Sequence, residues 1–169
     1  MKIIFKIFLW IALIIVSLIL IYRFIGQPQQ IWGNSMSPFL SSGSFVLSSK
    51  ITYIFRAPQR GDVVTFLAPG GTLFISRIIG LPGDKIQLIN GKVSVNGTEL
   101  YEPYLPPGTK TFPSDSGYSP STDLKSAIIV PENHFFMLSD NREHANDRRS
   151  MGYIQRKSIY GVVLTKVGR

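Results

Sequence analysis

The hydrophobic residues of this chain are gathered in one long run near its N-terminus. Residues 3–22 read IIFKIFLWIALIIVSLILIY, with Lys6 as the one charged side chain. A helix of that length spans about 30 Å, the thickness of the hydrocarbon core of a bilayer. A cleaved signal peptide is the competing interpretation, but no Ala-x-Ala cleavage pattern follows the run. We therefore expect residues 1–25 to form an uncleaved transmembrane anchor.

Beyond Gly26 the pattern changes to short runs of β-branched and aromatic residues separated by turn residues. Such runs predict strands, and the pairs Asn90-Gly91 and Asn96-Gly97 are typical of two-residue hairpins. The expected strands cover residues 44–49, 62–68, 72–80, 85–89, 92–95, 127–130, 134–138 and 158–165. The sequence thus predicts a mainly β, antiparallel domain over residues 26–169, carried on one N-terminal transmembrane helix.

Two further segments allow more than one interpretation. Residues 103–126 are rich in Pro, Gly, Ser and Thr, which predicts a long exposed loop rather than a linker between domains. Asn96-Gly97-Thr98 also matches a glycosylation sequon, although the hairpin explains the same residues.

The composition excludes some kinds of chemistry. The 169 residues include no cysteine, so disulfides, thiolate nucleophiles and Cys-ligated metals are absent. Two histidines, His134 and His144, are too few for a His-rich metal site, and no cofactor or metal is expected. The net charge is +8, but Lys and Arg occur singly or in pairs, so we expect no nucleic-acid partner. The excess charge instead favours an anionic membrane surface.

The charges around the apolar run predict its orientation. Lys2 and Lys6 precede the run and outnumber Arg23 after it, which places the N-terminus in the cytoplasm and the β domain outside. No Arg- and Ser-rich transit segment precedes the run. A single crossing of a bacterial plasma membrane is therefore the simplest expectation.

Four separated blocks carry the candidate chemistry. They are Gly33-Asn34-Ser35-Met36-Ser37-Pro38, Arg60-Gly61-Asp62, Arg77-Ile78-Ile79-Gly80-Leu81-Pro82-Gly83-Asp84, and Ser139-Asp140-Asn141-Arg142 continuing to Asp147-Arg148-Arg149. Behind an apolar anchor, these blocks resemble the type I signal peptidases of the S26 type, membrane serine endopeptidases that remove signal peptides from exported preproteins after small residues. The resemblance implies a signal-peptidase-type antiparallel β domain with preproteins and the lipid bilayer as partners.

The resemblance also implies roles for individual residues. Ser35 stands at the position of the nucleophile, and its backbone N–H, together with the Gly33 position, would form the oxyanion hole. The family's shallow substrate pockets correspond here to Ile31, Met36, Leu40, Phe74 and Ile75. Ordinary packing in the core would also explain apolar residues at these positions. Structural support is implied for Asp140, Asn141, Arg142, Asp147, Arg149 and Arg77.

The general base of the family is missing from this chain. Ser76 stands where the family has a lysine, and Ala145 stands where it has the serine that orients that lysine. A serine hydroxyl has no comparable basicity near neutral pH, and loss of a general base costs about 10² to 10⁴ in rate. Because eukaryotic relatives use a histidine as base, His144 is a possible substitute.

Two functions therefore remain open from the sequence. The first is a signal peptidase I-like enzyme with weak or unconventional activity, which the retained Ser35 favours. The second is a catalytically impaired or inactive paralogue that binds signal-peptide-like segments as a chaperone or assembly factor, which Ser76 and Ala145 favour. A third interpretation is an anchored β domain in which the motifs serve the fold alone.

Overall fold

The structure is a computed structural model, and it describes residues 2–24, 27–68, 71–111, 126–142 and 153–167. The expectations for His144, Ala145, Asp147 and Arg149 lie outside the described residues. So does most of the loop predicted over residues 103–126.

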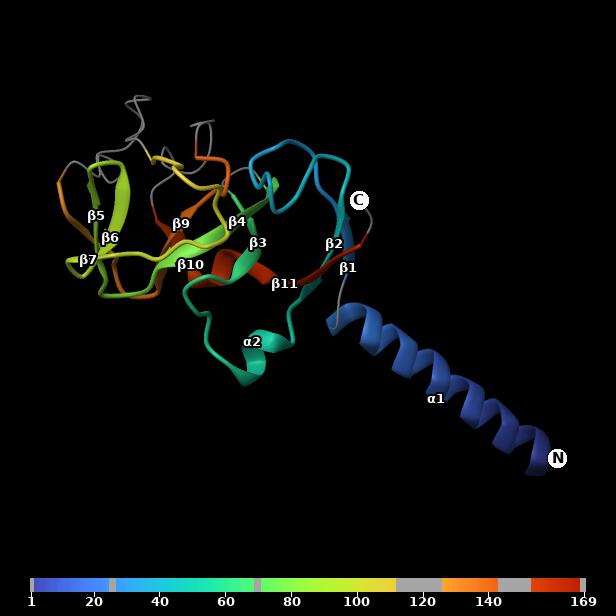
Figure 1. The fold of residues 1–169 in the computed structure, drawn as a ribbon. Coiled ribbons are helices and arrows are strands. Elements are labelled where there is room, and N and C mark those ends of the chain that lie inside the picture. Colours follow the sequence, from blue (N-terminus) through green and yellow to red (C-terminus); the bar gives the residue numbers. More distant parts are fainter. Residues whose placement is uncertain (1, 25–26, 69–70, 112–125, 143–152, 168–169) are drawn as a thin grey trace.

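The N-terminal run forms the helix α1 (Lys2–Phe24). Its first 19 residues, Lys2–Leu20, are long and apolar enough to cross a membrane, and none of that stretch is buried against the rest of the protein. Figure 1 shows the helix leaving the β domain as a separate arm. An apolar helix with no protein partner along its length is what a lipid environment accommodates.

Seven strands form the larger sheet, with every pair antiparallel. The strands are β1 (Gln27–Gln30), β2 (Phe45–Ser49), β3 (Val63–Leu67), β4 (Leu73–Gly80), β9 (His134–Leu138), β10 (Ile154–Gln155) and β11 (Ile159–Val167). Their order is β1-β2-β11-β3-β4-β9-β10, so the last strand of the chain inserts between two early ones. This insertion ties the C-terminal end of the domain to its N-terminal end.

A smaller sheet has the order β7-β6-β5-β8 and lies at the opposite end of the domain from α1 (Figure 1). It contains β5 (Lys85–Ile89), β6 (Lys92–Val95), β7 (Thr98–Glu99) and β8 (Ile128–Ile129). The turns between β5 and β6 and between β6 and β7 have positive φ at Asn90, Gly91, Asn96 and Gly97. Both hairpins expected from the Asn-Gly pairs are thereby confirmed, because such turns require left-handed backbone at both central residues.

The predicted mainly antiparallel β fold is confirmed, and each expected strand has a counterpart within one or two residues of its ends. The short elements β1, β7, β10, the helix α2 (Thr52–Phe55) and the 3-10 helix η3 (Arg156–Ser158) were not predicted. β1 reads QPQQ and is an edge strand paired with β2 alone. Its polar sequence has no hydrophobic alternation that could have indicated a strand.

Buried apolar residues form three clusters across the two sheets. One joins the small sheet to β9 and contains Ile79, Ile86, Val93, Val95, Val130, Phe136 and Leu138. The second contains Ile31, Met36, Leu40, Val46, Val63 and Ile75, and the third Val64, Phe66, Ile78, Phe135, Met137 and Ile154. The second and third use alternate residues of β3 and β4, so they occupy opposite faces of the large sheet.

Candidate active site

The segment between β1 and β2 carries Ser35, which is partly exposed. Turn hydrogen bonds shape this segment, with the Ser37 N–H donating to the Asn34 carbonyl at 3.1 Å and the Leu40 N–H to the Met36 carbonyl at 2.7 Å. Gly33 precedes the turn with φ +98°, a backbone conformation that residues with a side chain rarely adopt. The result is a tight turn with Ser35 at its start.

Asn141 holds this turn from the other end of the chain. Its backbone N–H donates to the Ser35 carbonyl at 2.9 Å, and its Nδ2 donates to the Asn34 carbonyl at 3.0 Å. Two donors from one residue fix both the position and the orientation of the turn. The Ser-Asp-Asn-Arg block that follows β9 is thus a direct support of Ser35.

Arg77 connects that block to β4. Its Nε and Nη2 donate to the two carboxylate oxygens of Asp140 at 2.8 and 2.5 Å, and its Nη1 donates to the Gly61 carbonyl at 3.0 Å. The guanidinium carbon lies 3.8 Å from the ring centre of Tyr104 and 5.2 Å from that of Phe39. The bidentate pair and the two rings hold the cation in a nearly buried position.

A second buried arginine, Arg142, extends the same network. Its side chain is fully buried and pairs with Glu102 at 2.5 Å, and it also donates to the Thr111 hydroxyl at 2.6 Å. Tyr104 donates its hydroxyl to the same Glu102 at 2.6 Å. Burial, together with the neighbouring Glu102 carboxylate, raises the pKa of the Tyr104 phenol above its ordinary value. Residues 102–111 are therefore fastened against the block that supports Ser35.

Below the Ser35 turn lies an apolar cluster that unites most of the predicted substrate-pocket residues. Ile31, Met36, Leu40 and Ile75 are buried together with Val46 and Val63. Phe74 is separated from them and packs against the cluster on the opposite face of the sheet. Neighbouring residues of a strand point to opposite faces, so Phe74 and Ile75 cannot share one pocket wall. The expectation that Phe74 contributes to a substrate pocket stays a prediction, and such a pocket would lie on the other face of β4 from Ile75.

Ser76 lies on the face of β4 that carries Phe74, opposite Val64 of β3. Its side chain is 1% exposed, and its hydroxyl has no hydrogen-bond partner. Ser76 is therefore not hydrogen-bonded to Ser35. An apolar setting of this kind lowers the pKa of an amine, so a lysine here would be poised to act as a base.

The backbone around Ser35 partly matches an oxyanion hole. The Ser35 N–H makes no hydrogen bond within the described part of the chain, so it is free to donate to a developing oxyanion. The Gly33 N–H, by contrast, donates to the Ser42 hydroxyl at 3.2 Å. Gly33 thus serves the shape of the turn, and its amide is already occupied.

β4 has an edge without a neighbouring strand beside this site. β3 pairs with Leu73 to Arg77 on one side, whereas β9 pairs on the other side only from Arg77 to Gly80. Among the described strands, none covers the second side of residues 73–76. An extended peptide could add to this edge by backbone hydrogen bonds.

The remaining motif residues support the scaffold. Arg60 pairs with Asp84 at 3.0 Å, and Arg56 pairs with Asp62 at 2.7 Å, so the blocks brace one another. The Nδ1–H of His134 donates to the Glu132 carbonyl, 2.7 Å away, and His134 lies far along the chain from the Ser35 turn. Within the described ranges no group of three or more potential metal ligands occurs.

Tyr104 and Glu102 were not predicted as part of the site, because nothing in their local sequence indicates contact with Arg77 or Arg142.

Comparison with known proteins adds an independent finding. Residues 4–167 match the family described as "Signal peptidase, peptidase S26". Signal peptidase IB of Staphylococcus aureus is 34% identical over 163 residues, covering 91% of this chain and 85% of the relative. A probable signal peptidase I-1 of Synechocystis is 32% identical over 167 residues, covering 91% and 79%. The crystal structure of a signal peptidase I from Enterococcus faecalis superimposes with a TM-score of 0.51 at 32% identity, covering 65% of this chain and 98% of that one.

Proposed function

Because the chain belongs to the S26 family of signal peptidases, we propose that it is a signal peptidase I-like membrane serine endopeptidase that uses Ser35 as its nucleophile. Its substrates are preproteins that carry signal peptides, cleaved after small residues. The observation that carries the proposal is the pair of hydrogen bonds from Asn141 that fixes the Ser35 turn. A nucleophile held this way attacks from one defined position, which is a large part of catalysis by orientation.

The substrate enters as an added strand along the open edge of β4. Its backbone pairs with residues 73–76, and its small side chains point toward the apolar cluster beneath the turn. Met36 and Ile75 belong to that cluster and are nearly or fully buried, so the cluster offers a packed apolar surface that suits small apolar side chains. The Ser35 N–H then donates to the oxyanion of the tetrahedral intermediate.

Turnover is slow, because no amine occupies position 76. The Ser76 hydroxyl is buried without a hydrogen-bond partner, and a serine hydroxyl is too weak a base to remove a proton from Ser35 near neutral pH. Orientation and oxyanion stabilisation still operate without a base, and such residual catalysis is well below that of a complete catalytic unit. His144 remains the substitute base to be tested.

The second candidate function is binding of signal-peptide segments without cleavage, as an impaired paralogue. It is favoured by the unpartnered hydroxyl of Ser76, which makes no link to Ser35. The same open β4 edge would serve this role.

The membrane arrangement belongs to the same proposal. Residues 1–25 form a single-pass anchor with the N-terminus in the cytoplasm, and residues 26–169 form one domain on the outer face of a bacterial plasma membrane. The support is the apolar helix α1 and the excess of Lys2 and Lys6 over Arg23.

The test is cleavage of a preprotein with an Ala-x-Ala site by the full chain in detergent or proteoliposomes. We expect slow cleavage that disappears in Ser35→Ala and that falls in His144→Ala if the histidine is the base. If the unmodified chain binds the preprotein but does not cleave it, the peptidase function is wrong and the binding function is supported instead. If the unmodified chain neither binds nor cleaves the preprotein, both proposed functions are refuted.

A further inference from the structure

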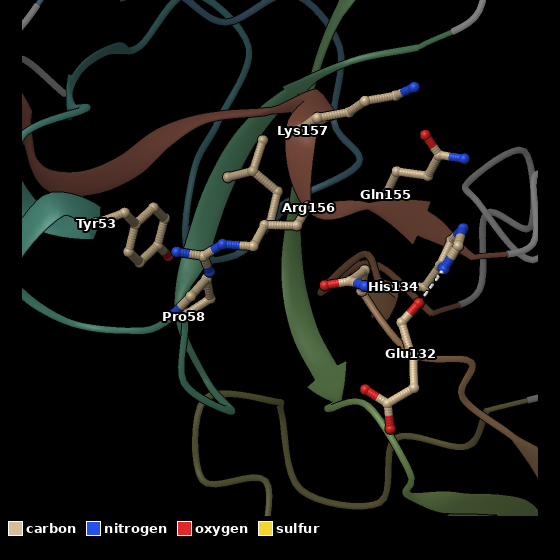
Figure 2. Close-up of a pocket in the computed structure, with 9 residues that line it drawn as sticks. Tyr53, Pro58, Glu132, His134, Gln155, Arg156 and Lys157 are labelled. Carbon is tan, nitrogen blue, oxygen red and sulfur yellow. Dashed lines mark hydrogen bonds between the residues drawn. The ribbon is translucent and has the colours of Figure 1, made fainter.

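A cavity of about 710 Å³ lies apart from the Ser35 site, between α2, the start of β9 and the β10–η3 segment. Its lining consists of Tyr53, Pro58, Glu132, Asn133, His134, Gln155, Arg156, Lys157 and Ile159. None of these belongs to the Ser35 turn, to β4 or to the Asp140–Arg142 block. Figure 2 shows Arg156 and Tyr53 on one side of the cavity and His134 and Glu132 on the other.

The cavity carries unneutralised positive charge. Arg156 and Lys157 bring two cations against the single carboxylate of Glu132. Neither cationic side chain makes a hydrogen bond or ion pair with any residue that the structure describes. The backbone of Arg156 is nevertheless fixed, because its N–H donates to the Asn133 carbonyl at 2.8 Å. Two cations held at a cavity without partners suit an anionic ligand.

The wall formed by α2 is rigid at its base. Tyr53 donates its hydroxyl to Asp62 at 2.9 Å, and Arg56 pairs with the same carboxylate. Burial and the Asp62 carboxylate raise the pKa of the Tyr53 phenol above its ordinary value, while the charges of Arg56 and Arg156 offset this in part. The phenol therefore stays protonated and keeps its hydrogen bond to Asp62.

The outer face of α2 is apolar and uncovered. Ile54 is 67% exposed and Phe55 82% exposed, and none of the four residues of α2 is buried. Two large apolar side chains on a short projecting helix are unfavourable in water. Apolar side chains directly beside cations are the pattern of a surface that lies in the interface of a bilayer.

The chain itself brings this surface close to a bilayer. α1 ends at Phe24 and β1 begins at Gln27, so the connection spans at most about 10 Å. In Figure 1, α2 projects from the side of the β domain where α1 leaves it. A domain on so short a tether samples the membrane surface continuously, at a high effective concentration of lipid headgroups.

We propose that this cavity binds the phosphate of an anionic phospholipid in the bilayer that holds α1, while Ile54 and Phe55 enter the interface. The inference rests on the membrane anchoring that is part of the proposed function. Arg156 and Lys157 pair with the phosphate, and the apolar residues Pro58 and Ile159 face the glycerol backbone. The site sets the tilt of the domain on the membrane and so the height of the Ser35 turn above it.

The experiment uses the absence of cysteine, which makes a single introduced thiol unique. Full-length Phe55→Cys is labelled with a polarity-sensitive fluorophore and reconstituted in nanodiscs of phosphatidylcholine with increasing phosphatidylglycerol. Tyr101→Cys, at a side chain 84% exposed beyond the small sheet, is the matched control. We expect a blue shift at position 55 that grows with phosphatidylglycerol, and no shift at position 101.

To test the role of charge, Arg156→Gln and Lys157→Gln are combined with Phe55→Cys in one variant. We expect the phosphatidylglycerol fraction at half-maximal shift to rise at least about fivefold. Lys85→Gln with Lys92→Gln removes the same charge from exposed positions of the small sheet and should leave the fraction unchanged. The proposed headgroup site is wrong if the blue shift at position 55 does not depend on phosphatidylglycerol. It is also wrong if both double variants weaken the shift equally.

Two further outcomes complete the test. If inorganic phosphate at millimolar concentration abolishes the shift, the cavity is a free-anion site and the lipid proposal is wrong. Ser35→Ala should leave the shift intact, because the readout does not involve peptide cleavage. Failure of the headgroup site and failure of the proposed peptidase activity are thereby distinguishable.

Discussion

The backbone N–H of Asn141 donates to the carbonyl oxygen of Ser35 at 2.9 Å. The Asn141 side chain donates to the carbonyl oxygen of Asn34, the residue before Ser35. Asn34 and Asn141 are 107 positions apart along the chain. The turn that presents Ser35 thus depends on a residue after β9, and its geometry responds to changes there.

Replacing Asn141 by Asp tests this dependence. The carboxylate cannot donate to the Asn34 carbonyl and places negative charge beside it. We expect kcat for preprotein cleavage to fall about 5- to 30-fold with KM little changed, as for loss of a hydrogen bond of about 1 to 2 kcal/mol. Asn90→Asp in the β5–β6 turn is the control, because Asp-Gly also suits that hairpin. Equal losses in both variants would contradict the assignment.

Ser76→Lys should restore a base. The side chain would enter the apolar face beside Val64 and Phe74, where burial lowers the pKa of an amine below its usual value of about 10.4. We expect cleavage at least about 100-fold faster than in the unmodified chain, rising with pH as the amine loses its proton. Adding Ala145→Ser should raise it further.

Ser48→Lys is the control for this gain, because Ser48 is equally buried and its hydroxyl also has no partner. Its pH–rate profile should match that of the unmodified chain. A gain in both lysine variants, or in neither, would argue against position 76 as the place of the base.

Tyr104 should stabilise the site through both its ring and its hydroxyl. Tyr104→Phe keeps the ring over Arg77 and removes the hydrogen bond to Glu102, whereas Tyr104→Leu removes both. Urea unfolding followed by circular dichroism should show Tyr104→Leu about 0.5 to 2 kcal/mol less stable than Tyr104→Phe. Identical stabilities would mean that the ring contact contributes nothing.

Asp62 should make stability depend on acid pH. Burial alone would raise its pKa, but hydrogen bonds from Arg56, the Gln59 N–H and Tyr53 outweigh burial and hold the pKa below its usual range. A carboxyl with a lowered pKa in the folded state contributes stability above its unfolded pKa of about 3.9, and this is lost as pH falls through the folded value. We expect the free energy of unfolding to decline less steeply below about pH 4 in Asp62→Asn. A parallel decline in both proteins would exclude Asp62 as the cause.

Much of the fold was predictable because its signals are local. Hydrophobic alternation has a period of two residues, and Asn-Gly pairs adopt the turn that two-residue hairpins need, so β5, β6 and their turns follow from neighbouring residues. β1 and α2 escaped prediction because QPQQ and a four-residue helix carry no periodic pattern. Their form depends on β2, Asp62 and the rest of the domain.

By itself, the sequence determined the apolar helix, the antiparallel strands and the four blocks that resemble signal peptidases, including the absence of a lysine at position 76. The tertiary structure alone decided that Asn141 holds Ser35 and that Arg156 lines a cavity beside α2. The physical reason is distance along the chain. These contacts join residues far apart in sequence, and they form only once the order of the strands, with β11 between β2 and β3, has brought the elements together.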